Sequence, residues 1–212
     1  MKSVKLFSFF KSSASWRVRI ALNLKKIEYD YIPVNILKSE GERQEGYANI
    51  NPLERVPSLI VDGNVLIESM PIIEFLDEVK PSPRLFPEDP FKKAQVRAVC
   101  EIINAGIQPL GNVTVLKQVK KQGGNPDEWL KYWMTFGVRK LEKHLEGFSG
   151  TNCFGNELTA ADLYIYPQLD ASINRVGINI HEYPNLARIF QHLNGLDAFI
   201  KARPEHQPDY QP

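Results

Sequence analysis

Three serines stand where a strand-like segment gives way to a helical pattern, and their hydroxyls could bind an anion. The sequence there reads Ser12-Ser13-Ala14-Ser15. One serine is enough to cap a helix, and serine is a preferred residue at that position. Because the first amides of a helix lack intrahelical partners, three hydroxyls could instead hold a thiolate or a carboxylate. The spacing alone leaves both interpretations open, a plain cap and an anion site.

A second candidate site is Glu68-Ser69-Met70-Pro71, at the start of another helical pattern. Ser69 as a helix cap is a sufficient explanation. The functional alternative is that its hydroxyl and the following amides bind a carboxylate at the positive end of the helix dipole, while Glu68 accepts from an ammonium group. An amino-acid zwitterion would suit that pair.

Val56-Pro57 leads into a strand-like run and is a third candidate. Most X-Pro bonds in folded proteins are trans, so the residues alone favour an ordinary trans proline at a strand start. If the bond is cis, the backbone of Val56 would turn outward as an edge on which a peptide could pair.

Three arginines could form a bidentate contact with a carboxylate if one of them points into a cleft between domains. They are Arg17, Arg19 and Arg175. Taken singly, an arginine on a helix is expected to be solvated. Cys100 and Cys153 have no base or metal-ligand cluster near them in sequence, so we expect small buried apolar residues.

The elements that position these residues alternate before a proline-rich stretch and become helical after it. Strands are predicted at residues 4–9, 29–34, 58–61 and 65–67, and helices at 16–26 and 69–79. Asp62-Gly63-Asn64 is typical of a hairpin turn. Later patterns predict a long helix from Pro90 to about residue 120, a second at 127–145, and a third that starts at a capping box formed by Thr159 and Asp162.

These patterns predict a small α/β domain at residues 1–80, a proline-rich linker at 81–90 and an all-helical domain at 91–212. The last residues, 203–212, are polar and hold three prolines, so they are predicted to form a surface tail.

Composition excludes several classes of protein. The chain has 212 residues, with 26 Lys plus Arg against 25 Asp plus Glu. This balance lacks the excess of positive charge that is typical of nucleic-acid-binding domains. Two cysteines and four histidines without ligand spacing predict neither a disulfide framework nor a metal site. The N-terminal apolar run is too short for a signal peptide, and no stretch reaches the roughly 18 apolar residues of a membrane helix. We therefore expect a cytoplasmic protein without a membrane or nucleic-acid partner.

Several motifs occur together in order and resemble the zeta class of glutathione transferases over nearly the whole chain. They are Ser12 to Leu22, Asn51-Pro52, Val56-Pro57, Glu68-Ser69, Ile107 to Leu110, Thr159 to Leu163, Pro167-Gln168 and Gln207-Pro208-Asp209. The resemblance implies a thioredoxin-like α/β N-terminal domain, an all-α C-terminal domain, a homodimer, and glutathione bound in the cleft.

The resemblance also assigns roles to residues. Ser12 and Ser13 would hold the glutathione sulfur as a thiolate, and Val56, before a cis proline, would pair with the cysteinyl backbone. Glu68 and Ser69 would take the γ-glutamyl end. The residues assigned to glutathione are Ser12, Ser13, Ala14, Ser15, Trp16, Arg17, Gln44, Val56, Pro57, Glu68, Ser69, Gln108, Asn112, Val113 and Thr114. The residues assigned to catalysis are Ser12, Ser13, Arg17 and Arg175, of which Arg175 would face the carboxylate of a small anionic, electrophilic substrate.

One position departs from the class. Its signature commonly reads Ser-Ser-Cys, and here the third place is Ala14. A cysteine there could form a mixed disulfide with glutathione, whereas alanine cannot. Since glutathione supplies the attacking sulfur, activity need not be lost.

The activity implied is glutathione-dependent cis–trans isomerisation of a maleyl-type keto acid, such as maleylacetoacetate or maleylpyruvate, in the catabolism of tyrosine, phenylalanine or other aromatic rings. Thiolate addition, bond rotation and elimination would return glutathione unchanged. One alternative is a transferase that conjugates electrophiles or dehalogenates small α-halo acids. Another is a non-catalytic protein of the same fold that binds ligands or serves in assembly.

Overall fold

The computed structural model describes residues 1–38 and 45–211. Its contacts divide the chain into two compact units, Met1–Arg84 together with Leu196–Pro212, and Leu85–Gly195. The first unit therefore includes a C-terminal segment that the sequence pattern places in the helical domain.

The first unit is built on a four-stranded mixed sheet in the order β2-β1-β3-β4. The strands are β1 (Val4–Ser8), β2 (Asp30–Pro33), β3 (Ser58–Val61) and β4 (Asn64–Ile67). β1 runs parallel to β2 and antiparallel to β3, and β3 pairs antiparallel with β4. Asp62 and Gly63, with φ of 49° and 87°, form the two-residue turn between β3 and β4, because such turns need positive φ at both positions. All four strands lie where the sequence predicts them.

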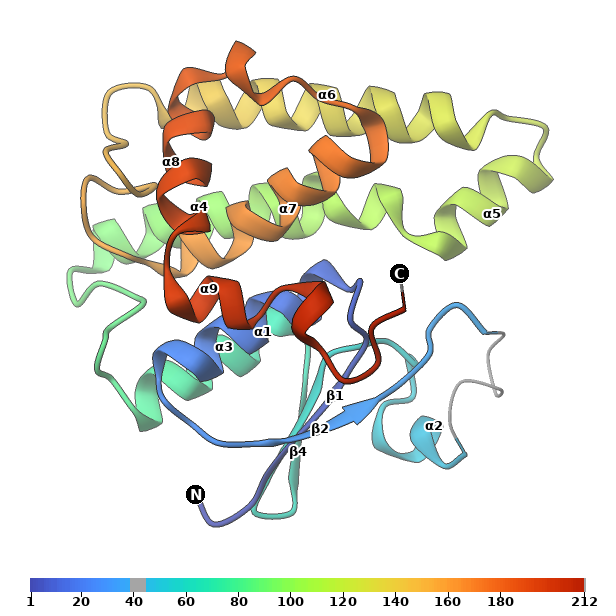
Figure 1. The fold of residues 1–212 in the computed structure, drawn as a ribbon, viewed down its shortest axis with the longest axis vertical. Coiled ribbons are helices and arrows are strands. Elements are labelled where there is room, and N and C mark those ends of the chain that lie inside the picture. Colours follow the sequence, from blue (N-terminus) through green and yellow to red (C-terminus); the bar gives the residue numbers. More distant parts are fainter. Residues whose placement is uncertain (39–44, 212) are drawn as a thin grey trace. The chain divides into compact units, whose positions relative to one another are not determined.

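The helices of the first unit are α1 (Ser13–Leu24), α2 (Tyr47–Ile50), α3 (Ser69–Val79), α9 (Asp197–Lys201) and the 3₁₀ turn η3 (Pro204–His206). α1 and α3 lie side by side and α9 packs against α1 (Figure 1). α3 has the predicted bounds. α1 begins three residues earlier than predicted, because Ser12 caps it and the serines after it are already helical.

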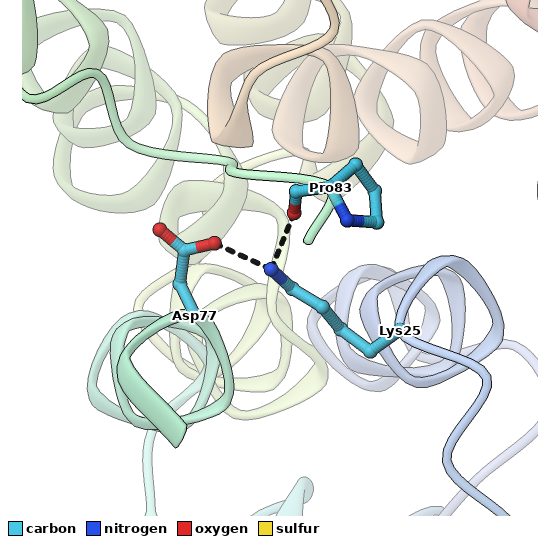
Figure 2. Close-up of polar contacts among 3 residues, drawn as sticks. All are labelled: Lys25, Asp77 and Pro83. Atoms are coloured by element: carbon cyan, nitrogen blue, oxygen red, sulfur yellow. Dashed lines mark hydrogen bonds and ion pairs between the residues drawn. The ribbon is translucent and has the colours of Figure 1, made fainter. Parts of the chain in front are cut away.

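A buried ion pair joins the far ends of α1 and α3. The Lys25 ammonium donates to Asp77 at 2.5 Å and to the carbonyl of Pro83 at 2.5 Å (Figure 2). Both charged side chains are almost fully buried, at 0% and 2% exposed. Lys25 therefore links the C-terminal ends of α1 and α3 to the segment around Pro83.

An aromatic cluster of the first unit lies beneath the two turns that carry candidate site residues. Phe7, Phe9 and Phe10 pack with Val34, Tyr47 and Val56, and each is buried. Phe9 and Phe10 are separated from Ser12 by Lys11 alone, and Val56 precedes Pro57. The same core thus supports both turns.

The second unit is helical throughout its regular structure. Its elements are α4 (Pro90–Gly106), η1 (Gln108–Gly111), α5 (Val113–Lys121), α6 (Pro126–Leu145), α7 (Ala160–Val176), η2 (Ile180–Glu182) and α8 (Pro184–Asn194). α7 packs against α4, α6 and α8.

The long helix predicted from Pro90 to about residue 120 is wrong. α4 ends at Gly106, and a 3₁₀ turn separates it from α5. Ile107, with φ of −125°, leaves helical geometry, and Pro109 has no N–H to continue the hydrogen-bond pattern. A methyl group at Gly137 of α6 would lie 2.5 Å from the Ile107 side chain, so this turn also packs tightly on α6.

The predicted capping box at α7 is confirmed. The buried Asp162 carboxylate accepts from the amide of Thr159 at 2.8 Å and from that of Cys153 at 2.8 Å. It thereby fixes the loop that enters α7.

The surface tail predicted at residues 203–212 is correct in part, since Glu205, His206, Pro208, Tyr210 and Gln211 are exposed. Gln207 is buried, and the Asp209 carboxylate accepts from the Phe10 amide and the Tyr31 hydroxyl. Long-range contacts to the aromatic core, which composition does not reveal, hold the segment in place.

Within residues 1–38 and 45–211, no helix is long and apolar enough to cross a membrane. The same residues contain no cluster of three or more His, Cys, Asp or Glu side chains that could hold a metal ion.

Candidate functional site

The N-terminus of α1 presents hydroxyls at the start of a helix. The amide of Ser12 donates to the carbonyl of Phe9 at 2.9 Å, which closes the turn before the helix. The Ser12 hydroxyl oxygen accepts from the Ser15 amide at 3.2 Å, so the cap interpretation is correct for this residue. A cap does not exclude the anion site, because the hydroxyl proton of Ser12 can still be donated.

Ser13, the first residue of α1, is half-buried, and its hydroxyl has no hydrogen-bond partner within the described part of the chain. No acidic residue occupies the first turn of α1. The positive end of the helix dipole and this hydroxyl can therefore act together on a bound anion.

The remaining residues of the motif turn inward. Ala14 is half-buried, whereas Ser15, Trp16 and Arg17 are buried. The Ser15 hydroxyl has no hydrogen-bond partner among the described residues. Ala14 and Ser15 therefore form part of the first turn of α1 through their backbone, and neither side chain makes a hydrogen bond among the described residues.

The expectation that Arg17 is solvated is wrong. Its guanidinium is fully buried and donates to the Ser69 hydroxyl at 3.2 Å. Ser69 is the first residue of α3, so one cation lies against a hydroxyl at the positive end of that helix. Arg17 and Ser69 form a buried link between the two helices that carry candidate residues.

Glu68, next to Ser69, has an unusual backbone. Its φ is 67° and its ψ is 135°, a conformation that costs a non-glycine residue about 1–3 kcal/mol. Its side chain is exposed, so the carboxylate is available to an ammonium group. Strain of this kind often occurs at functional sites.

The Val56-Pro57 peptide bond is cis. The trans bond favoured by the residues alone is wrong, and the cis bond implied by the family resemblance is confirmed. Val56 lies outside the β1–β3 ladder, and its backbone N–H and C=O have no partner among the described residues. An extended peptide could pair there.

Two side chains that the residue-by-residue analysis missed hold this turn. The buried Tyr47 hydroxyl donates to the Arg55 carbonyl at 2.6 Å and lies 2.8 Å from the Ser58 hydroxyl. Asn51 donates to the same carbonyl at 2.8 Å. Asn51-Pro52 was a signal, since it belongs to the motif set that carries the family resemblance.

Arg19 is also fully buried, so its predicted solvation is wrong as well. Its guanidinium donates to three backbone carbonyls and the Ser8 hydroxyl. It serves the structure of the first unit and has no role as a carboxylate ligand.

In the second unit, five candidate residues come together around Gly111. Gln108 donates to the Asn112 side chain at 2.7 Å, and Asn112 precedes α5, whose first residues are Val113 and Thr114. The Arg175 guanidinium donates to the Gly111 carbonyl at 3.1 Å.

The Arg175 side chain is exposed overall, and partial burial of its guanidinium lowers the pKa of this group. A cation and the positive end of α5 thus lie close together, which suits an anionic ligand.

Both cysteines lie in the interior, as predicted. Neither Cys100 nor Cys153 is in a disulfide, and both are fully buried. Burial is the main cause that raises the pKa of the Cys153 thiol, and the neighbouring Asp162 carboxylate raises it further. A buried thiol with a raised pKa is a poor nucleophile. Gln44, the remaining predicted residue, lies outside the described residues.

Comparisons with known proteins identify the family. Residues 11–79 match the family model for the glutathione S-transferase N-terminal domain. Maleylacetoacetate isomerase of Mus musculus is 42% identical over 205 residues, covering 96% of this chain and 94% of that protein. Glutathione S-transferase Z1 of Arabidopsis thaliana is 41% identical, covering 98% and 95%. The chain belongs to the zeta-class glutathione S-transferases.

Solved structures agree with this membership. A maleylpyruvate isomerase described as a bacterial zeta-class glutathione S-transferase has 35% identity and a TM-score of 0.91, covering 98% of this chain and 100% of that chain. Maleylacetoacetate isomerase of Anaeromyxobacter dehalogenans with bound glutathione has 34% identity and a TM-score of 0.88, covering 99% and 98%. The expected glutathione transferase fold, a thioredoxin-like domain with a helical domain, is confirmed for this zeta-class protein.

Proposed function

We propose that this protein catalyses the glutathione-dependent cis–trans isomerisation of maleylacetoacetate or a close maleyl-type keto acid such as maleylpyruvate. The observation that carries this function is a helix start rich in hydroxyls with no reactive thiol of its own. Both cysteines are fully buried, and Ala14 occupies the position where the class often has cysteine. A reactive sulfur at this site would therefore come from a bound thiol, and relatives at about 42% identity bear the isomerase name.

The residues of the first unit fit glutathione. The unpaired backbone of Val56 can hold the cysteinyl residue in extended form. Ser69, the positive end of α3 and the exposed Glu68 suit the carboxylate and ammonium of the γ-glutamyl group. Ser15 and Trp16 complete the first turn of α1, and Pro57 fixes the edge beside Val56.

Bound glutathione supplies a thiolate that can add to the double bond and leave again after rotation. The hydroxyls of Ser12 and Ser13 donate hydrogen bonds to the sulfur, and the positive end of the α1 dipole stabilises the negative charge of the thiolate. Together they lower the pKa of the thiol. Arg17 acts through Ser69, whose hydroxyl it holds.

Arg175 binds a carboxylate of the substrate and stabilises the charge that develops on the conjugated carbonyl. This role is supported by the partly buried guanidinium of Arg175, which lies beside the N-terminus of α5. Further glutathione contacts are proposed at the same turn, from Gln108, Asn112, Val113 and Thr114. A contact between Gln44 and glutathione stays a prediction. This set of groups implies a small anionic, electrophilic substrate.

A stoichiometric assay tests the proposed function. Maleylacetoacetate or maleylpyruvate is supplied in large excess over glutathione, and both compounds are followed. We expect many turnovers per glutathione with no loss of the free thiol, because elimination regenerates it. Consumption of one glutathione per product would instead establish conjugation or dehalogenation. Glutathione binding without turnover would establish a binding protein, and either outcome would contradict isomerisation.

The homodimer and the cytoplasmic location are further proposals, which rest on the resemblance to the zeta class. The neutral charge balance, 26 basic against 25 acidic residues, supports a small-molecule substrate over a nucleic-acid partner.

A further inference from the structure

The C-terminal segment, residues 196–211, reaches the turn that leads into α1. One Asp209 carboxylate oxygen accepts from the Phe10 amide at 3.1 Å, and the other accepts from the Tyr31 hydroxyl at 2.6 Å. Phe10 lies two residues before Ser12, the cap of α1. A side chain near the end of the chain thus holds the turn at residues 9–12.

Arg19 attaches the same segment to the same turn from the interior. Its guanidinium donates to the carbonyls of Ala202 at 3.0 Å, Phe10 at 3.0 Å and Phe9 at 3.4 Å. Burial lowers the pKa of Arg19 to about 10, so it stays charged at neutral pH. One cation therefore joins the C-terminal segment to Phe9 and Phe10, in the turn before the serine motif.

The segment itself is fixed by its own contacts. Gln207 donates to the carbonyls of Lys201 at 3.0 Å and Arg203 at 2.8 Å, which closes the turn that delivers Asp209. The Tyr210 ring packs edge-on against Phe10 with 5.6 Å between ring centroids. Asp209 is thus held in one position relative to Phe10.

Only a carboxylate suits this arrangement. Burial and then the hydrogen bond to Asp209 raise the pKa of Tyr31, so its hydroxyl stays protonated and donates. The two carboxylate oxygens each accept one bond, from a hydroxyl and from an amide. Because the two donors contact different oxygens, asparagine would turn its NH₂ group toward one of them, and two donors would then face each other.

We infer that Asp209 is a positioning residue for the chemistry of the proposed site. It holds the Phe10 amide, and through the turn closed by the Ser12 N–H and the Phe9 carbonyl it sets the place of the Ser12 and Ser13 hydroxyls. The inference rests on the proposed function, because the sulfur that these hydroxyls would contact is that of glutathione.

The test compares Asp209→Asn and Tyr31→Phe with the matched control Asp197→Asn. Asp197 lies in the same C-terminal segment, but it forms an exposed pair with Lys201. For each full-length variant, kcat and KM for glutathione are measured with maleylpyruvate. The pKa of the bound glutathione thiol is measured by ultraviolet absorbance, at a temperature at which circular dichroism shows a folded protein.

We expect Asp209→Asn to lower kcat by about 10- to 100-fold, since a misplacement of about 1 Å can cost 10²-fold. The pKa of the bound thiol should rise, and KM should change less than kcat. Tyr31→Phe, which removes only one of the two donors, should shift both quantities in the same direction by a smaller amount and serves if Asp209→Asn fails to fold. Asp197→Asn should match the unaltered protein.

Unchanged kcat and thiol pKa in folded Asp209→Asn or Tyr31→Phe would overturn the inference and leave Asp209 a purely structural residue. The proposed function fails separately, when the unaltered protein itself shows no glutathione-dependent turnover.

Discussion

Replacing Ser13 by alanine is expected to lower kcat for isomerisation by about 10- to 100-fold, because a hydrogen bond to a charged group contributes about 1.5–3 kcal/mol and its loss reduces the fraction of bound glutathione that is thiolate. Ser13 is the first residue of α1, and its hydroxyl has no competing partner within the described residues. Without it the sulfur loses a donor and the pKa of the bound thiol rises. Steady-state kinetics with saturating glutathione measure the effect.

Ser13→Ala is a cleaner test than a change at Ser12. The Ser12 hydroxyl caps α1, so removing it also costs about 0.5–2 kcal/mol of stability. Ser3→Ala, which makes the same change at an exposed serine before β1, is the control and should leave kcat unaltered. Full activity of Ser13→Ala would mean that this hydroxyl does not hold the sulfur.

Replacing Lys25 by methionine is expected to reduce the free energy of unfolding by about 3–5 kcal/mol, the usual cost of breaking a buried pair by removing one partner. The change takes the ammonium away from the buried Asp77 carboxylate and from the Pro83 carbonyl. Urea denaturation measures the loss. Lys201→Met removes the cation of an exposed pair with Asp197 and should change stability little.

A double variant separates the charge from the packing. Lys25→Met combined with Asp77→Leu replaces both buried charges by apolar side chains, a change that is often neutral or stabilising. We expect it to recover most of the lost stability, since no carboxylate remains buried without its lysine. A double variant as unstable as Lys25→Met would contradict the ion-pair explanation.

Local sequence signals predicted most of the elements that carry the site. The Asp62-Gly63 turn and the start of α3 at Ser69 depend on residues adjacent in sequence, so their patterns are readable. The break after Gly106 was missed. Helical periodicity continues across Ile107 and outweighed two local signs of a helix end, Gly106 and Pro109.

Long-range contacts explain what the residue patterns could not predict. Arg17 and Arg19 look like solvated helix residues, but their partners lie far away in sequence, at Ser69 and Ala202. The C-terminal segment looks like a polar tail because its anchors are single side chains, Gln207 and Asp209. The family resemblance supplied the cis bond before Pro57, which composition cannot show.

A titration of the glutathione thiol bound to the unaltered protein shows whether the hydroxyls and the dipole at the start of α1 hold the sulfur of glutathione as a thiolate. Thiolate absorbance is followed against pH, with free glutathione and the Ser13→Ala complex as references. We expect a bound thiol pKa well below the value of about 8.5 that is usual for a free cysteine thiol. A bound thiol that titrates like free glutathione would contradict it.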